Sequence, residues 1–236
     1  MDLKLEKLLY FDVETVAKYK SLKDMPSDER KIWDSYRNTF EKRVTDESKL
    51  VGWNPDGDEY LEELYKQTAG LFPEFGKVCC VSLGFVTNKG EVKLESHCGE
   101  DERTILINTR KVFDKVESMD FTLCGQNIKK FDIPFLGKRY FINGLKPPKM
   151  FPSHDTKPWD LKLVDTKDVW SFGSYGLSSL DLITTMLGVD SPKNGDVRGD
   201  SVNEFYWKGE HKLIGEYCER DVKALIDITQ KLNSLE

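Results

Sequence analysis

The chain has 236 residues, of which 39% are hydrophobic and 32% are charged, and its formal net charge is −6. This composition is typical of a folded globular chain and excludes a largely disordered one. No apolar run approaches the roughly 18 residues that a membrane-spanning helix needs, and residues 1–7 lack the apolar core of a secretion signal, so we expect a cytoplasmic protein that makes no membrane contact.

The first predicted strand is the apolar stretch from Lys7 to Val13, which leads into an Asp-x-Glu pair, Asp12 and Glu14. We expect this pair at the C-terminal end of a buried strand. Residues 17–70 then carry two helical patterns separated by a Gly- and Pro-containing turn. We interpret them as a helical insertion within one domain that spans residues 1–236, and we hypothesise that the insertion narrows access to a site.

Strands and helices alternate through the rest of the chain. The predicted strands cover residues 77–87, 91–95, 121–125 and 162–165. The predicted helices cover residues 101–117, 131–143, 177–187 and 211–233. Residues 191–200 contain Pro and Gly and are expected to form a loop. This order predicts an α/β fold, with a mixed β-sheet flanked by helices and the helical insertion after the first strand.

The five cysteines are an odd number and include no Cys-x-x-Cys pair. Most lie in apolar, strand-like or helix-like stretches. We therefore expect all of them to be reduced core residues, without a disulfide or a zinc site.

Four carboxylates, Asp12, Glu14, Asp132 and Asp221, come from three separate apolar segments. Positions i and i+2 of a strand face the same way, so the first two should point together. Asp132 lies near the N-terminus of a predicted helix, and Tyr217 shares a helix face with Asp221 because the two are four residues apart. Buried carboxylates without partners repel each other, so the pattern predicts a cage for divalent cations.

Oxygen ligands of this kind suit Mg²⁺ or Mn²⁺ better than Zn²⁺. Two such ions would assist displacement at a phosphodiester, and Tyr217 could either orient the attacking water or help to take its proton. Residues 127–170 hold 9 Lys and Arg against 5 Asp and Glu. A basic rim around an acidic centre is suited to a nucleic-acid substrate.

The acidic segments resemble three motifs of the DEDD 3′–5′ exonucleases, which have a ribonuclease H-like fold. The matching segments are Phe11-Asp12-Val13-Glu14-Thr15, Asn127-x-x-x-Phe131-Asp132 and Tyr217-x-x-x-Asp221. The third has the form of the tyrosine variant, DEDDy. Within that group the chain is most similar to predicted exonucleases related to the proofreading domains of family B DNA polymerases. Supporting segments are Pro73-Glu74-Phe75-Gly76-Lys77, Ser191-Pro192-Lys193 and Tyr217-Cys218-Glu219-Arg220-Asp221-Val222.

The resemblance implies a hydrolase that binds two Mg²⁺ or Mn²⁺ ions and releases nucleoside 5′-monophosphates from the 3′ end of single-stranded DNA. It implies four metal ligands, Asp12, Glu14, Asp132 and Asp221, and a catalytic role for Tyr217 in positioning water. It also implies that the backbone near Val13 and Thr15, together with the Asn127 side chain, holds the 3′-terminal nucleotide. It covers most of the chain except residues 17–70, and no motif residue is replaced.

Two other functions stay open. An exonuclease acting on RNA or short oligoribonucleotides would carry the same acids, since no residue in the sequence reveals a contact to the 2′-hydroxyl. A nucleic-acid-binding module without turnover would retain the fold, although the intact acids argue against it.

Overall fold

The computed structural model describes residues 3–44, 46–157, 160–192 and 195–235. Lys193, part of one supporting segment, lies outside them. The strands are β1 Leu8–Ala17, β2 Gly76–Val86, β3 Val92–Cys98, β4 Thr122–Gly125 and β5 Leu163–Asp165. The longer helices are α1 Ser27–Ser35, α3 Asp58–Thr68, α4 Glu102–Ser118, α5 Asp132–Ile142 and α9 His211–Asn233. Shorter helices are α2 Arg37–Glu41, α6 Thr166–Ser171, α7 Leu180–Leu187 and α8 Val202–Trp207.

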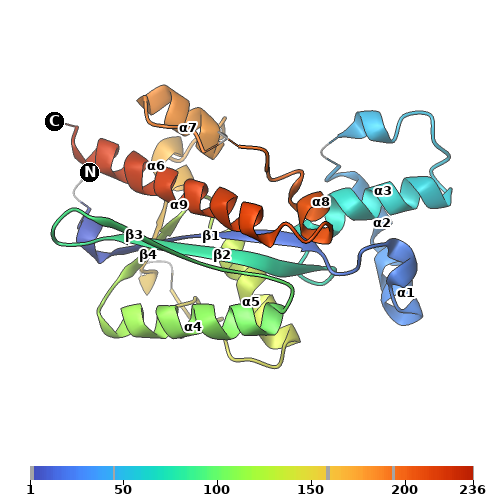
Figure 1. The fold of residues 1–236 in the computed structure, drawn as a ribbon, viewed down its shortest axis with the longest axis horizontal. Coiled ribbons are helices and arrows are strands. Elements are labelled where there is room, and N and C mark those ends of the chain that lie inside the picture. Colours follow the sequence, from blue (N-terminus) through green and yellow to red (C-terminus); the bar gives the residue numbers. More distant parts are fainter. Residues whose placement is uncertain (1–2, 45, 158–159, 193–194, 236) are drawn as a thin grey trace.

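The five strands form one mixed sheet in the order β3-β2-β1-β4-β5. β1 is antiparallel to β2 and parallel to β4, β2 is antiparallel to β3, and β4 is parallel to β5. The sheet lies between helical layers, with α4 and α5 on one face and α9 on the other (Figure 1). The expected α/β architecture with a mixed sheet is confirmed, and it is the ribonuclease H-like fold.

Alternation along β1 divides its side chains between the two faces of the sheet. Leu9, Phe11 and Val13 join the core that includes residues of α4 and α5. Leu8 and Tyr10 face the other way and pack with apolar residues of α9. Asp12 and Glu14 continue this second face, so the sequence pattern itself turns both carboxylates toward α9.

The helix α9 approaches the sheet closely at Gly84 of β2. A Cβ at this position would lie 2.8 Å from Val222 and 2.7 Å from Leu94, closer than side chains tolerate. The helix is further fastened by a hydrogen bond of 2.6 Å from the Ser96 hydroxyl to the Glu219 carboxylate. The sequence thus fixes α9 against β2 and β3, which sets the position of the acid that the helix carries.

The segment between β1 and β2 contains α1, α2 and α3, which lie beyond one end of the sheet (Figure 1). These helices have their own apolar cluster, in which Trp33 stacks on Phe40 at a centroid distance of 5.2 Å and Tyr65 packs edge-on against Trp33. Ile32 and Tyr36 of the same segment are exposed and stay outside this cluster.

The expectation of five reduced cysteines was wrong for one pair. Cys80 and Cys98 face each other across the antiparallel strands β2 and β3, with Cα atoms 4.0 Å apart, and form a disulfide. Sequence spacing could not show this because the two residues become neighbours only through strand pairing. Cys79, Cys124 and Cys218 are buried free thiols.

Candidate active site

A pocket of about 290 Å³ lies between β1, the loop after β4, and α9. It brings together all four carboxylates that the sequence singled out, from three different elements. Its lining comprises Asp12, Val13, Glu14, Gln126, Asn127, Phe131, Asp132, Ser179, Leu180, Asp181, Pro192, Tyr217 and Asp221. No Lys or Arg belongs to this lining among the described residues.

The two acids of the first motif lie in the middle of β1, not at its end as expected. The strand continues to Ala17 because its residues up to that point pair with β2. The parallel pairing with β4 covers only Leu8 to Tyr10. Asp12 therefore lies just beyond the point where β1 loses its parallel neighbour, and the pocket opens there.

An irregularity in the sheet accompanies Glu14. The register between β1 and β2 shifts between Glu14 and Thr15, which leaves Cys79 as an extra residue on β2. The Cys79 thiol lies 3.3 Å from the Glu14 carbonyl oxygen. Bulges of this kind bend a strand and redirect a side chain, and they are common beside active sites.

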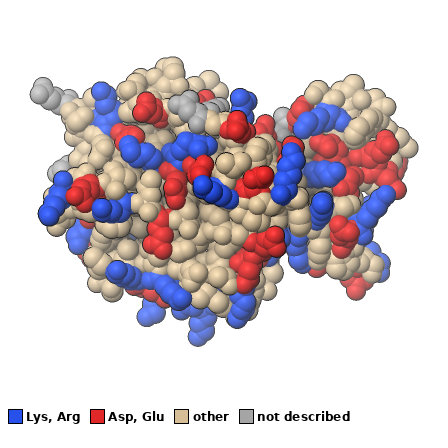
Figure 2. Space-filling view, in the orientation of Figure 1, with Lys and Arg blue, Asp and Glu red and all other residues tan. Residues whose placement is uncertain are grey.

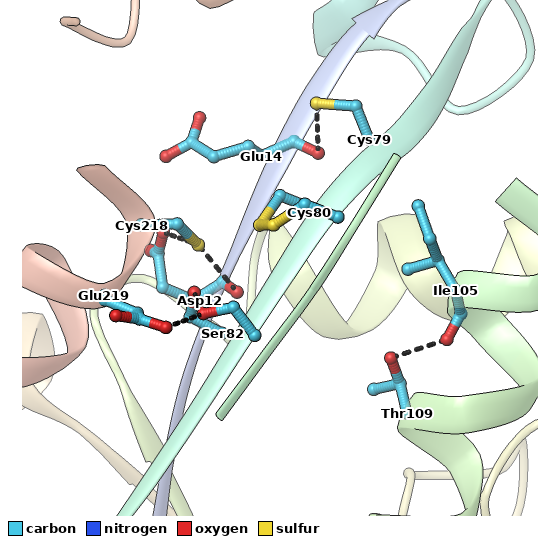
Figure 3. Close-up of a disulfide and its surroundings, with 11 residues drawn as sticks. Asp12, Glu14, Cys79, Cys80, Ser82, Ile105, Thr109, Cys218 and Glu219 are labelled. Atoms are coloured by element: carbon cyan, nitrogen blue, oxygen red, sulfur yellow. Dashed lines mark hydrogen bonds between the residues drawn. A yellow bond between two sulfur atoms is a disulfide. The ribbon is translucent and has the colours of Figure 1, made fainter. Parts of the chain in front are cut away.

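The helix α9 contributes Tyr217, Cys218 and Asp221 to the other wall. The Cys218 thiol lies 3.3 Å from Oδ2 of Asp12 and donates to it across the gap between α9 and β1 (Figure 3). Ligand atoms of Asp12, Glu14 and Cys218 all lie within 4.8 Å of one another. Tyr217 and Asp221 line the same pocket, as their spacing of four residues predicts.

The second motif lies in the loop after β4, and hydrogen bonds from this loop to the Asp165 carboxylate hold it in place. Asn127 has a positive φ of 60°, and its amide donates to Asp165 at 2.8 Å. The other oxygen of Asp165 accepts from the amide of Lys129 at 3.2 Å. This loop places Asp132 as the first residue of α5, where free helical amides favour a carboxylate.

Burial and mutual repulsion make the carboxylates of Asp12, Glu14 and Asp132 hard to ionise. Burial raises the pKa of Asp12 to about 6. Burial also raises the pKa of Glu14, helped by the charges of Asp12, Asp221 and Asp132. The pKa of Asp132 rises for the same reasons, burial first and Asp12 second. A cluster of this kind is electrostatically incomplete without cations.

The donor set fits hard divalent cations. The four carboxylates supply oxygen ligands, which Mg²⁺ and Mn²⁺ prefer. Burial and the charges of Asp12 and Glu14 raise the pKa of the Cys218 thiol well above its ordinary value, so the thiol stays protonated and acts as a hydrogen-bond donor. A protonated thiol does not offer the thiolate that soft metals select.

Val13 and Thr15, the residues of the first motif expected to hold the terminal nucleotide, lie beside a second, larger depression. This groove of about 1090 Å³ runs between β1, α3 and α8. Val13 and Glu14 line both the groove and the pocket, whereas Thr15 lines the groove only. The Thr15 hydroxyl donates to the Gly70 carbonyl at 2.6 Å, which ties β1 to the end of the helical segment.

Sequence reasoning missed several residues of the site. Cys218 directly follows Tyr217, and the sequence predicted only a core residue at this position. Asp181 lines the pocket as a further acid, but its sequence context showed only the start of a helix. Asp165 supports the second motif from a neighbouring strand. None of them could be found by motif spacing, since each reaches the site through tertiary packing.

The sheet order and the position of the acids on β1, α5 and α9 define an α/β protein of the ribonuclease H-like exonuclease fold. Residues 71–225 match the family described as "Predicted 3′-5′ exonuclease related to the exonuclease domain of PolB". The chain belongs to this family, as its motifs predicted. No curated protein matches the sequence.

Two solved structures can be compared with the chain. The family B DNA polymerase of the hyperthermophilic archaeon Pyrobaculum calidifontis is 15% identical with a TM-score of 0.56, and the match covers 95% of this chain and 24% of the polymerase. Exonuclease I of E. coli, in complex with a dT13 oligonucleotide, is 12% identical with a TM-score of 0.44, over 95% of this chain and 40% of that one. The chain thus spans less than half the length of either protein.

Within the described residues, no helix combines the length and apolar character needed to cross a bilayer. The cytoplasmic location stays a prediction.

Proposed function

We propose that the chain is a 3′–5′ exonuclease that hydrolyses phosphodiester bonds at the 3′ end of single-stranded DNA with two divalent ions, Mg²⁺ or Mn²⁺, and releases nucleoside 5′-monophosphates. The observation that carries the proposal is the convergence of Asp12, Glu14, Asp132 and Asp221 in one pocket, together with Tyr217. Membership of an exonuclease family supports it. We also propose that residues 1–236 act as one exonuclease domain, with residues 17–70 as its insertion.

The four carboxylates would hold the ions, and each would then be stabilised in its ionised form. Bound ions would lower the pKa of the attacking water and would stabilise the negative charge on the departing 3′ oxygen. The protein contributes positioning, because the β1 pair, α5 and α9 are fixed by the sheet and its packing. Val13 and Asn127, also in the pocket, are proposed to hold the terminal nucleotide beside the carboxylates.

Tyr217 was expected to orient the water or to help take its proton, and its surroundings favour the first role. Burial raises the pKa of its phenol well above 10, and the charges of Glu14, Asp221 and Asp12 raise it further. A phenol that stays protonated can donate and accept hydrogen bonds but is a poor base. We propose that Tyr217 orients the water.

The test is degradation of 5′-labelled single-stranded DNA and RNA with Mg²⁺, with Mn²⁺ and with EDTA. The expected result is a metal-dependent ladder that shortens from the 3′ end. It should be lost in Asp12→Ala and weakened in Tyr217→Phe. Asp114→Ala, an acid of α4 on the opposite face of the sheet, and Tyr206→Phe, outside the pocket, are matched controls. Absence of cleavage by every protein would overturn the proposal.

The same experiment ranks the two alternatives. Faster shortening of RNA than of DNA would identify an RNA exonuclease with the same acids. Oligonucleotide binding that persists in Asp12→Ala, without a metal-dependent product from the wild type, would identify a binding module without turnover.

We propose that the insertion restricts access, since α3 forms a wall of the large groove beside the pocket. The groove lining contains nine Asp and Glu against five Lys. Figure 2 shows a dense group of acidic side chains on this lobe, where α3 lies. An acidic wall repels phosphates, so it would keep duplex nucleic acid away from the pocket. Cleavage of duplex ends as fast as single strands by the wild type would contradict this role.

A further inference from the structure

The loop of residues 172–177, named here the aromatic loop, joins α6 to α7. Phe172 is 94% exposed, Tyr175 is fully exposed and Leu177 is 80% exposed. No residue from Val169 to Leu180 is charged. Large apolar side chains grouped in this way on a surface mark a binding site more often than they mark ordinary surface.

Hydrogen bonds fasten both ends of the aromatic loop to the rim of the acidic pocket. On the α6 side, Thr166 donates to the Gly125 carbonyl at 3.1 Å, and the Lys167 ammonium lies 3.2 Å from the Asn127 side-chain oxygen. On the α7 side, the Gln126 side chain donates to the Ser178 carbonyl. Ser179 and Leu180, which follow Ser178, line the pocket. The loop is thus held at the mouth of the site, although its rings contact little of the protein.

The backbone of the aromatic loop is unusual at Phe172. This residue has φ 47° and ψ 36°, a left-handed conformation that a bulky side chain rarely adopts, and Gly173 follows with φ 76°. The Ser174 amide closes the turn on the Ser171 carbonyl at 2.8 Å. Packing of the side chain does not explain this strained backbone, because Phe172 is almost fully exposed, and such strain is typical of functional positions.

Charge distinguishes the two sides of the pocket. On the insertion side lies the acidic groove, which disfavours phosphates. On the side of the aromatic loop lie two lysines: Lys129 pairs with Asp168 of α6 at 2.7 Å, and Lys167 of α6 reaches Asn127. A strand whose end enters the pocket is therefore favoured on the loop side, where cations meet phosphates and rings meet bases.

We propose that the aromatic loop is a stacking platform for the unpaired bases of a single-stranded nucleic acid whose 3′ end lies in the pocket. Phe172 and Tyr175 stack on bases, and Lys167 faces the phosphate nearest the pocket. The choice of occupant rests on the proposed function. Bases offer flat faces to such rings whatever their sequence, so the platform prefers single strands over duplexes without reading sequence.

The test compares three proteins: the wild type, the double variant Phe172→Ala/Tyr175→Ala and the single variant Phe141→Ala. Phe141 is a matched control because it is 70% exposed and lies near the far end of α5. Fluorescence anisotropy in EDTA measures binding of labelled oligothymidylate. We expect the double variant to raise Kd about tenfold or more and the control to leave it unchanged. Duplex binding should change in neither.

A kinetic experiment checks that the pocket itself is intact. The p-nitrophenyl ester of thymidine 5′-monophosphate presents one nucleotide and cannot reach the aromatic loop. Its kcat/KM should be the same in wild type and the double variant, whereas KM for oligothymidylate should rise in the double variant with kcat retained. Equal loss on both substrates would indicate a damaged pocket and would overturn the platform.

The outcomes separate this inference from the proposed function. An unchanged Kd for oligothymidylate in the double variant overturns the platform, even if the wild type is an active nuclease. Conversion of a wild-type dimer to a monomer in that variant, without a change in Kd, overturns it in favour of an interface between copies. Loop-dependent binding by a wild type that cleaves nothing would support the platform and defeat only the proposed catalysis.

Discussion

The thiol of Cys218 on α9 donates a hydrogen bond of 3.3 Å to Oδ2 of Asp12 on β1, and it also lies 3.4 Å from the Asp12 carbonyl oxygen. This contact joins two residues that are 206 positions apart in the sequence. It fixes the orientation of one acid in a cluster whose members repel each other. Cys218 is thus a positioning residue for the first motif.

Replacing Cys218 tests this role. Cys218→Ala removes the donor to Asp12, so we expect nuclease activity to fall roughly tenfold and the Mg²⁺ concentration for half-maximal activity to rise, since one hydrogen bond to a charged group is worth about 1.5–3 kcal/mol. Cys218→Ser keeps a donor and should retain more activity. Cys124→Ala, another buried thiol, is the control. Equal Mg²⁺ dependence in all four proteins would contradict the role.

The acidic pocket should destabilise the protein when cations are withheld. The pKa of Asp12 is about 6 in the folded chain, above its ordinary value. A group of this kind favours folding at acidic pH and loses that contribution as pH rises through its folded pKa. In EDTA we expect Tm to fall between about pH 4 and 7, and to fall less in Asp12→Asn. Differential scanning calorimetry measures both slopes.

Cations should reverse this effect in the same proteins. At neutral pH, Mn²⁺ should raise Tm of the wild type because it binds the folded chain only. It should raise Tm of Asp12→Asn much less, and Asp114→Asn should behave like the wild type. Equal stabilisation of all three would place the ions elsewhere.

The disulfide between Cys80 and Cys98 should contribute to stability. Its loop is short, with a sequence separation of 18, and β3 is an edge strand of the sheet. Opening such a loop costs about 2–4 kcal/mol. We expect a reducing agent to lower Tm of the wild type and to leave Cys80→Ser/Cys98→Ser unaffected. Similar melting of the wild type in both buffers would show that the bond adds no stability.

Arg139 of α5 should have a structural role, because it is buried and its partner is a buried carboxylate away from the acidic pocket. Its guanidinium donates to the buried Glu102 carboxylate at 2.7 and 2.5 Å, and the same carboxylate accepts from the Val78 amide at 2.8 Å. Removing one partner of a buried pair costs about 3–5 kcal/mol. Arg139→Met should therefore unfold at lower denaturant concentration, with the activity of the folded fraction retained. A selective loss of kcat would contradict this.

The strain at Phe172 predicts a variant in which stability and binding change in opposite directions. Glycine adopts φ 47° freely, so Phe172→Gly should stabilise the fold by about 1 kcal/mol. The same change removes one stacking ring and should weaken oligothymidylate binding. Thermal melting and anisotropy on one sample check both. A less stable variant would show that the ring contributes packing in the folded state.

The sequence by itself determined most of the elements and the acids. Alternating apolar residues predicted the strands, and the helix expected over 211–233 coincides with α9. The motif residues Asp12, Asp132 and Asp221 were named because charges in apolar stretches are costly without a purpose. Local periodicity and residue chemistry carry this information. Two helices of six residues, α6 and α8, were not predicted, because fewer than two helical turns offer too few positions to show a period.

Only the tertiary structure decided how these parts meet. β1 runs on past Asp12 because β2 supplies partners as far as Ala17, which the sequence of one strand cannot show. The Cys80–Cys98 bond and the contact of Cys218 with Asp12 depend on strand pairing and helix docking. These relationships join residues distant in the chain, so their energies arise from packing that no local pattern encodes.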